Sequence, residues 1–153
     1  AVARPDLALF ALDVSPEALG LARANAERLG VADRIEFVVA DLAEPPASWA
    51  GRMAAVVSNP PYVSEEEWAG LSPEVRDHEP RMALVPGPTG LEAYGRVAVS
   101  AAALLGPGGH LVLELGFGRE EGARRAVANA GFRGLEAIPD LRGIPRVLLS
   151  RKA

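Results

Sequence analysis

The sequence of 153 residues contains no cysteine and only two histidines. The absence of cysteine excludes disulfide bonds, thiolate metal sites and cysteine nucleophiles. The two histidines, His78 and His110, are too few for a metal site built from several imidazoles. We therefore expect neither a metal centre nor thiol chemistry.

Long apolar runs and an excess of basic residues are also missing. No apolar run reaches the roughly 20 residues that span a membrane, and residues 1–5 show no signal-peptide pattern, so we expect a cytoplasmic protein without a membrane partner. Sixteen Lys and Arg residues stand against twenty Asp and Glu, a formal net charge of -4. Binding to a phosphate backbone relies on basic side chains that displace counterions. The charge balance therefore argues against nucleic acid as a direct partner, although it does not exclude a local basic patch.

What is present is the composition of one globular domain, with 49% hydrophobic and 24% charged residues. Short apolar runs typical of buried strands alternate with segments that have helical spacing. This β-α-β-α order predicts an α/β fold with a doubly wound, mostly parallel sheet and a C-terminal antiparallel strand. The predicted strands are residues 7–12, 35–40, 53–58, 110–115, 135–138 and 146–150.

Local signals set the boundaries of the predicted helices. Ser15 and Pro16 indicate an N-cap and a first helical residue, and Gly30 ends that helix. Two pairs read as capping boxes, Ser64 with Glu67 and Thr89 with Glu92. Further helices are expected over residues 91–104 and 119–130, a turn over 106–109, and a long ordered loop over 72–88.

Each of three predicted strands is followed directly by a polar residue. Ligands bind beyond the carboxyl ends of strands in such sheets, so Asp13, Asp41 and Asn59 are candidate site residues. A carboxylate at Asp13 suits the two hydroxyls of a ribose, with helix capping as the alternative. A carboxylate at Asp41 suits the amino group of adenine, with a simple turn residue as the alternative.

The sequence Asn59-Pro60-Pro61-Tyr62 is the strongest signal. Two prolines remove two backbone donors and fix two φ angles, so the nearby carbonyl oxygens have no competing N–H group. The Asn59 side-chain oxygen and the Pro60 carbonyl then each accept one hydrogen of a planar NH2 group. Tyr62 adds a flat ring that suits a flat substrate or a cationic methyl donor. The alternative is a rigid turn with a half-buried tyrosine.

This motif resembles that of class I methyltransferases acting on planar nitrogens. Over nearly its whole length the chain resembles the peptide chain release factor N(5)-glutamine methyltransferase family. The matching stretches are residues 11–19, 56–62, 73–84 and 113–116, among which the stretch through Glu79-Pro80 is more specific than the motif itself.

The resemblance implies a Rossmann-like fold and S-adenosyl-L-methionine as the cofactor, with the side-chain amide of a glutamine in a release factor as the substrate. It assigns the cofactor ribose to Asp13, with Val14 beside it, and the adenine to Asp41 and Leu42. It assigns the glutamine amide to Asn59–Tyr62, with Asn59 also next to the cofactor and with catalytic roles for Asn59, Pro60 and Tyr62. It gives Glu79 no secure role in function, and a structural role in ordering the 72–88 loop is an equally good interpretation.

The family's first strand, its Gly-rich loop and its N-terminal helical domain are expected upstream of Ala1. Residues 1–153 are therefore expected to form a partial catalytic domain whose sheet lacks its middle strand, between residues 7–12 and 53–58. For the isolated chain we expect weak cofactor binding and self-association. Two other functions stay open: methylation of an exocyclic amine of adenine, cytosine or guanine in RNA or DNA, and a fragment without catalytic activity.

Overall fold

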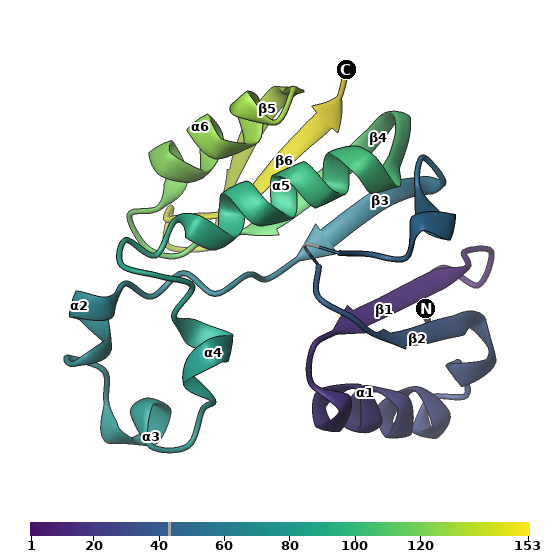
Figure 1. The fold of residues 1–153 in the computed structure, drawn as a ribbon, viewed down its shortest axis with the longest axis horizontal. Helices are drawn as coiled ribbons and strands as arrows, with labels where there is room; N and C mark the ends of the chain where they lie inside the picture. Colours follow the sequence, from purple (N-terminus) through teal and green to yellow (C-terminus); the bar gives the residue numbers. More distant parts are fainter. Residues whose placement is uncertain (43) are drawn as a thin grey trace. The chain divides into compact units, whose positions relative to one another are not determined.

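The computed structural model describes residues 1–42 and 44–153. The chain forms two compact units, residues 1–46 and residues 47–153. The strands of the two units form separate sheets, one of two strands and one of four (Figure 1).

The first unit is a β-α-β arrangement. Its strands β1 (Leu9–Asp13) and β2 (Ile35–Val39) pair in parallel, and helix α1 (Pro16–Arg28) packs against both. The predicted helix start is confirmed, because the Ser15 hydroxyl accepts the Ala18 N–H at 3.0 Å. Gly30 has φ 66°, a left-handed conformation that favours glycine and ends the helix.

The second unit is a four-stranded sheet with order β3-β4-β6-β5. Strands β3 (Met53–Ser58) and β4 (Leu105–Glu114) are parallel, and β6 (Pro145–Lys152) is antiparallel to both β4 and β5 (Phe132–Pro139). Mostly parallel strands with a C-terminal antiparallel strand confirm the predicted fold class. Strands β1 and β3 each lie at an edge of their own sheet.

Helices α5 (Glu92–Leu104) and α6 (Glu120–Asn129) cover one face of the four-stranded sheet (Figure 1). The apolar side of α5 is buried as predicted, including Tyr94, Val97 and Ala101. Alternate residues of the strands face these helices and form the core, because successive side chains of a strand point to opposite faces. The fully buried leucines of the sheet and its margins are Leu105, Leu111, Leu113, Leu115 and Leu148.

The segment between β3 and α5 is more regular than predicted. Residues 64–68 form the expected capped turn, helix α2 (Glu65–Trp68), but the predicted loop over residues 72–88 contains two short helices. They are α3 (Pro73–Arg76) and α4 (Arg81–Leu84). Pro73 occupies the first turn of α3, where the missing N–H of proline costs nothing, so its presence was a start signal rather than a loop signal.

Two further local predictions are wrong in detail. Residues 106–109 lie inside β4 as an irregularity, since the register jumps from Met53↔Leu105 to Ala55↔His110. Helix α5 begins at Glu92 with Leu91 as its N-cap, and the Glu92 carboxylate accepts the Thr89 N–H at 2.9 Å. The Thr89 hydroxyl accepts the Leu91 N–H instead of that of Glu92, so only half of the reciprocal capping pattern forms.

Among the helices of residues 1–42 and 44–153, none combines the length and apolar character that crossing a membrane requires.

Candidate functional site

The Asn59-Pro60-Pro61-Tyr62 segment leaves β3 directly at its carboxyl end. Asn59 is exposed and Pro60 is buried. Within the described residues, neither the Asn59 side-chain amide nor the Pro60 carbonyl has a hydrogen-bond partner. The two acceptors that the sequence predicts for an NH2 group are therefore unused by the fold of this unit.

Tyr62 is half-buried, and its ring packs against the backbone of Gly116, just beyond the end of β4. A methyl group on Gly116 would lie 2.6 Å from Cδ2 and 2.7 Å from Cγ of the ring. Any other residue at position 116 would thus displace Tyr62. The Gly116 N–H donates to the hydroxyl of Tyr94 at 3.0 Å, and burial raises the pKa of that hydroxyl.

The Tyr62 carbonyl is held from a different side. Arg119 donates its Nε–H to that carbonyl at 3.1 Å, and its Nη2 pairs with the Glu67 carboxylate. Glu67 also accepts the Ser64 N–H at 2.8 Å, which confirms the predicted capping box of α2. Gly90, at φ 76°, lets its backbone approach both the Tyr62 carbonyl and the Arg119 guanidinium. Residues 116–119 and Gly90 of the second unit therefore meet at Tyr62, and Glu67 supports Arg119 from α2.

Four of the five residues predicted to bind the cofactor, Asp13, Val14, Asp41 and Leu42, lie in the first unit, and the fifth, Asn59, lies in the second. The parallel register places Asp13 opposite Val39, so Asp13 and Asp41 share the carboxyl edge of the two-stranded sheet. The Asp13 carboxylate accepts the Ser15 N–H at 2.9 Å, and Ser15 itself caps α1. Val14 is 44% exposed, and Leu42 lies in the turn that follows Asp41. The structure thus brings Asp13 and Asp41 to one edge, and it places Asn59–Tyr62 in the other unit.

The contacts of Glu79 bear on the interpretation that this residue orders the predicted loop. The Glu79 backbone N–H donates to Val75 at 2.9 Å, but its carboxylate makes no hydrogen bond or ion pair within the described residues. Nothing in the side-chain contacts supports the interpretation that Glu79 orders residues 72–88.

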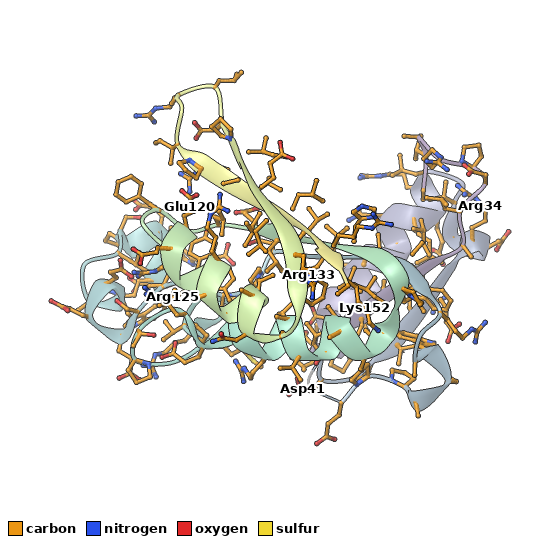
Figure 2. All side chains as sticks on the ribbon, turned by 90° about the horizontal axis from the view of Figure 1, so that it is seen from above. Arg34, Asp41, Glu120, Arg125, Arg133 and Lys152 are labelled. Atoms are coloured by element: carbon orange, nitrogen blue, oxygen red, sulfur yellow. The ribbon has the colours of Figure 1, made fainter. Side chains whose placement is uncertain are left out.

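Concave regions occur elsewhere in each unit. One, of about 330 Å³, is lined in part by Arg133 and Lys152 on the last two strands (Figure 2). Another, of about 620 Å³, lies between the start of β1 and residues 33–36. Neither is lined by the motif. In the part of the chain that the structure describes, no group of three or more His, Asp or Glu side chains is placed to hold a metal ion.

Arg119, Tyr94 and Gly90 are site residues that the sequence did not single out. The hydrogen bond between Gly116 and Tyr94 joins residues 22 positions apart, and the one between Arg119 and Tyr62 joins residues 57 positions apart. No local pattern encodes such contacts. Of the residues around Tyr62, only Gly116 had a signal in the sequence, because it lies in the stretch 113–116 that resembles the family.

Solved structures define the class of this fold. The S-adenosylmethionine-dependent methyltransferase SibL matches with a TM-score of 0.67 at 17% identity, covering 98% of this chain and 45% of SibL. TrmN from Thermus thermophilus matches with a TM-score of 0.62 at 25% identity, covering 94% of this chain and 36% of TrmN. A family model described as an RMKL-like methyltransferase domain matches residues 1–67. The chain therefore has the fold of the S-adenosylmethionine-dependent methyltransferases.

Within that class, the chain is similar to release factor glutamine methyltransferases, which confirms the resemblance predicted from the sequence. The enzyme of Cereibacter sphaeroides is 42% identical over 148 residues, which are 97% of this chain and 52% of the relative. That of Nitratidesulfovibrio vulgaris is 43% identical over 153 residues, 97% of this chain and 51% of the relative. The chain spans about half the length of these relatives.

The contacts of Glu67 lead to a prediction about pH. The backbone N–H of Ser64, aided by the charge of Arg119, holds the pKa of the Glu67 carboxyl below its ordinary value of 4.5. The ionised form thus stabilises the fold; this contribution is fully present above about pH 4.5 and is lost as pH falls through the lower, folded-state pKa. Glu67 is half exposed, so we expect Glu67→Ala to lower the free energy of unfolding by only about 0.2–1 kcal/mol at neutral pH.

Urea denaturation at about pH 7 and about pH 3 checks this expectation. The difference between Glu67→Ala and the wild type should shrink at the lower pH. Glu66→Ala, an exposed neighbour in the same helix, is the control and should show little difference at either pH. An equal cost of Glu67→Ala at both pH values would contradict the assigned role of the charge.

Proposed function

We propose that this chain is the catalytic segment of an S-adenosylmethionine-dependent methyltransferase that modifies the side-chain amide of a glutamine in a peptide chain release factor. The observation that carries the proposal is the pair of unused acceptors, on Asn59 and Pro60, next to a tyrosine whose ring and carbonyl are both held by other residues. The relatives named release factor glutamine methyltransferase, 42–43% identical, support the choice of substrate.

These residues act by positioning the substrate amide. An amide nitrogen is a poor nucleophile, because its lone pair is delocalised into the carbonyl. The Asn59 side-chain oxygen and the Pro60 carbonyl each accept one amide hydrogen, which fixes the plane of the NH2 group and the direction of its lone pair. Tyr62 supplies a flat surface for the planar amide. Holding one reactant in a near-attack geometry lowers the barrier without a strong base, and the proton leaves once the nitrogen is cationic.

The cofactor residues fit the same reaction by their donor and acceptor types. When bound, S-adenosylmethionine supplies a methyl group activated by a sulfonium. Asp13, with Val14, would hold the ribose, since a carboxylate accepts from both hydroxyls. Asp41 and Leu42 would hold the adenine through a polar and an apolar contact. Asp13 keeps one carboxylate oxygen beyond the one that accepts the Ser15 N–H.

Methyl transfer to purified substrates tests the proposed function. With labelled S-adenosylmethionine, we expect the full-length protein to methylate a glutamine of a release factor and to leave DNA and RNA unmodified, consistent with the acidic charge balance. A translation protein as substrate places the reaction in the cytoplasm. Labelling of nucleic acid with none of the release factor would instead establish an exocyclic-amine methyltransferase.

Asn59→Ala removes one of the two acceptors. By analogy with the loss of one preorganised polar contact, we expect the barrier of the chemical step to rise by about 2.7–4 kcal/mol, with a smaller effect on cofactor affinity. Single-turnover methylation measures the first quantity and calorimetric titration the second. Asn129→Ala, an exposed residue at the end of α6, is the matched control. A near-normal single-turnover rate in Asn59→Ala would remove this residue from the reaction.

We also infer that the isolated chain of 153 residues associates with copies of itself through β3. This strand is at the edge of its sheet, contains no charged residue or proline, and exposes 75% of Val57. Apolar edge strands without such protection pair with other chains.

Light scattering of the 153-residue chain should therefore show oligomers, and Val57→Lys should reduce them. Val99→Lys, which makes the same change at an exposed position on α5, should not. A wild-type chain that stays monomeric at all concentrations would refute the inference.

A further inference from the structure

Arg119 is the most enclosed of the arginines that form ion pairs. Its side chain is 18% exposed, against 35% to 68% for the others. Taking a guanidinium out of water is costly unless its donors are used. Two of them are, toward Tyr62 and Glu67. The enclosure of Arg119 thus has a specific tertiary cause.

Local helix physics does not explain an arginine at this position. Arg119 is the N-cap of α6, yet its side chain makes no capping hydrogen bond. Ser, Thr, Asp and Asn are the residues that cap helices well. A cation is also unfavourable near a helix N-terminus, where the helix dipole is positive. Arginine at position 119 therefore costs α6 stability, and the contacts it makes elsewhere must offset that cost.

Those contacts meet at the end of the Asn59–Tyr62 motif. The Nε–H of Arg119 holds the Tyr62 carbonyl at 3.1 Å, while Gly116 supports the ring of the same residue. The next residue, Val63, donates its N–H to Leu84 at 2.9 Å. Because the two prolines fix two φ angles upstream of Tyr62, a shift of Tyr62 is passed back to the Asn59 and Pro60 acceptors.

We propose that Arg119 is a positioning residue for the transferase reaction: by clamping the Tyr62 carbonyl to α2 and α6, it sets the placement of the two acceptors that hold the substrate amide. The proposal rests on the proposed function, and Arg119 acts through the motif without touching the substrate. A planar fork is required, because one guanidinium reaches the carbonyl and the Glu67 carboxylate together, whereas the single ammonium of lysine does not offer that geometry.

The kinetic test uses three variants of the full-length protein. Misplacement by about 1 Å far from the chemistry costs on the order of 10²-fold in rate, so Arg119→Ala should lower kcat by about that factor with little change in KM for S-adenosylmethionine. Arg119→Lys should recover only part of the loss. Arg125→Ala is the matched control. Arg125 lies on α6 (Figure 2), pairs with Glu121 and is 68% exposed, so kcat should be unchanged.

A second readout does not depend on activity. The chain has two tyrosines, Tyr62 and Tyr94, so selective labelling of tyrosine rings gives two sets of NMR signals from this chain. Arg119→Ala should shift or broaden the Tyr62 signals more than those of Tyr94, and Arg125→Ala should shift neither. Tyr62→Phe, which removes one of the two sets of tyrosine signals, identifies those that belong to Tyr62.

The outcomes separate the two proposals. Unshifted Tyr62 signals, or an unchanged kcat in Arg119→Ala, would overturn the positioning role. A shifted Tyr62 without methylation of any substrate by the wild type would instead refute the proposed function. If Arg119→Ala does not fold, Arg119→Lys decides: wild-type kcat and wild-type Tyr62 signals in that variant would overturn the role, and a lowered kcat with shifted Tyr62 signals would support it.

Discussion

The fixation of Tyr62 is the constraint on which the candidate site depends. The two prolines before it leave that stretch without backbone donors, so the segment cannot anchor itself by regular pairing. The segment is anchored at its last residue, where Gly116 supports the Tyr62 ring and Arg119 holds the Tyr62 carbonyl. The absence of donors that frees the Asn59 and Pro60 acceptors is thus the same property that makes external anchors necessary.

The anchors are in turn supported by the core. Gly116 donates its N–H to Tyr94, whose ring is fully buried on the inner side of α5. A buried phenol needs a partner for its hydroxyl, and the backbone of Gly116 provides one. Arg119 is supported by the charge of Glu67, which is itself fixed by its capping role at the start of α2. Helix capping, core packing and one ion pair therefore all bear on the position of a single side chain.

This arrangement agrees with the small catalytic demand of the proposed reaction. A sulfonium-borne methyl group is already activated, so the protein needs acceptors in fixed places more than a strong acid or base. The second unit has such acceptors and little else of a reactive kind at the end of β3. The first unit has two carboxylate-bearing residues, Asp13 and Asp41, at one edge of its sheet, a chemistry that suits a nucleoside.

The sequence by itself determined the order of the strands, most helix ends and the motif, because these depend on near neighbours, whereas β4 and β5 each begin earlier than predicted. Ser15 caps α1, Ser64 and Glu67 form their box, and β3 has the predicted bounds, each from contacts within a few residues. The tertiary structure alone decided the rest. The register shift of β4 arises from its pairing with β3. The Thr89 hydroxyl accepts the Leu91 N–H and not the Glu92 N–H, because α5 starts later than predicted. Gly116 and Arg119, which hold the ring and carbonyl of Tyr62, lie more than 50 positions away from it. Their meeting with Tyr62 depends on the packing of α5, α6 and the sheet, which no local pattern specifies.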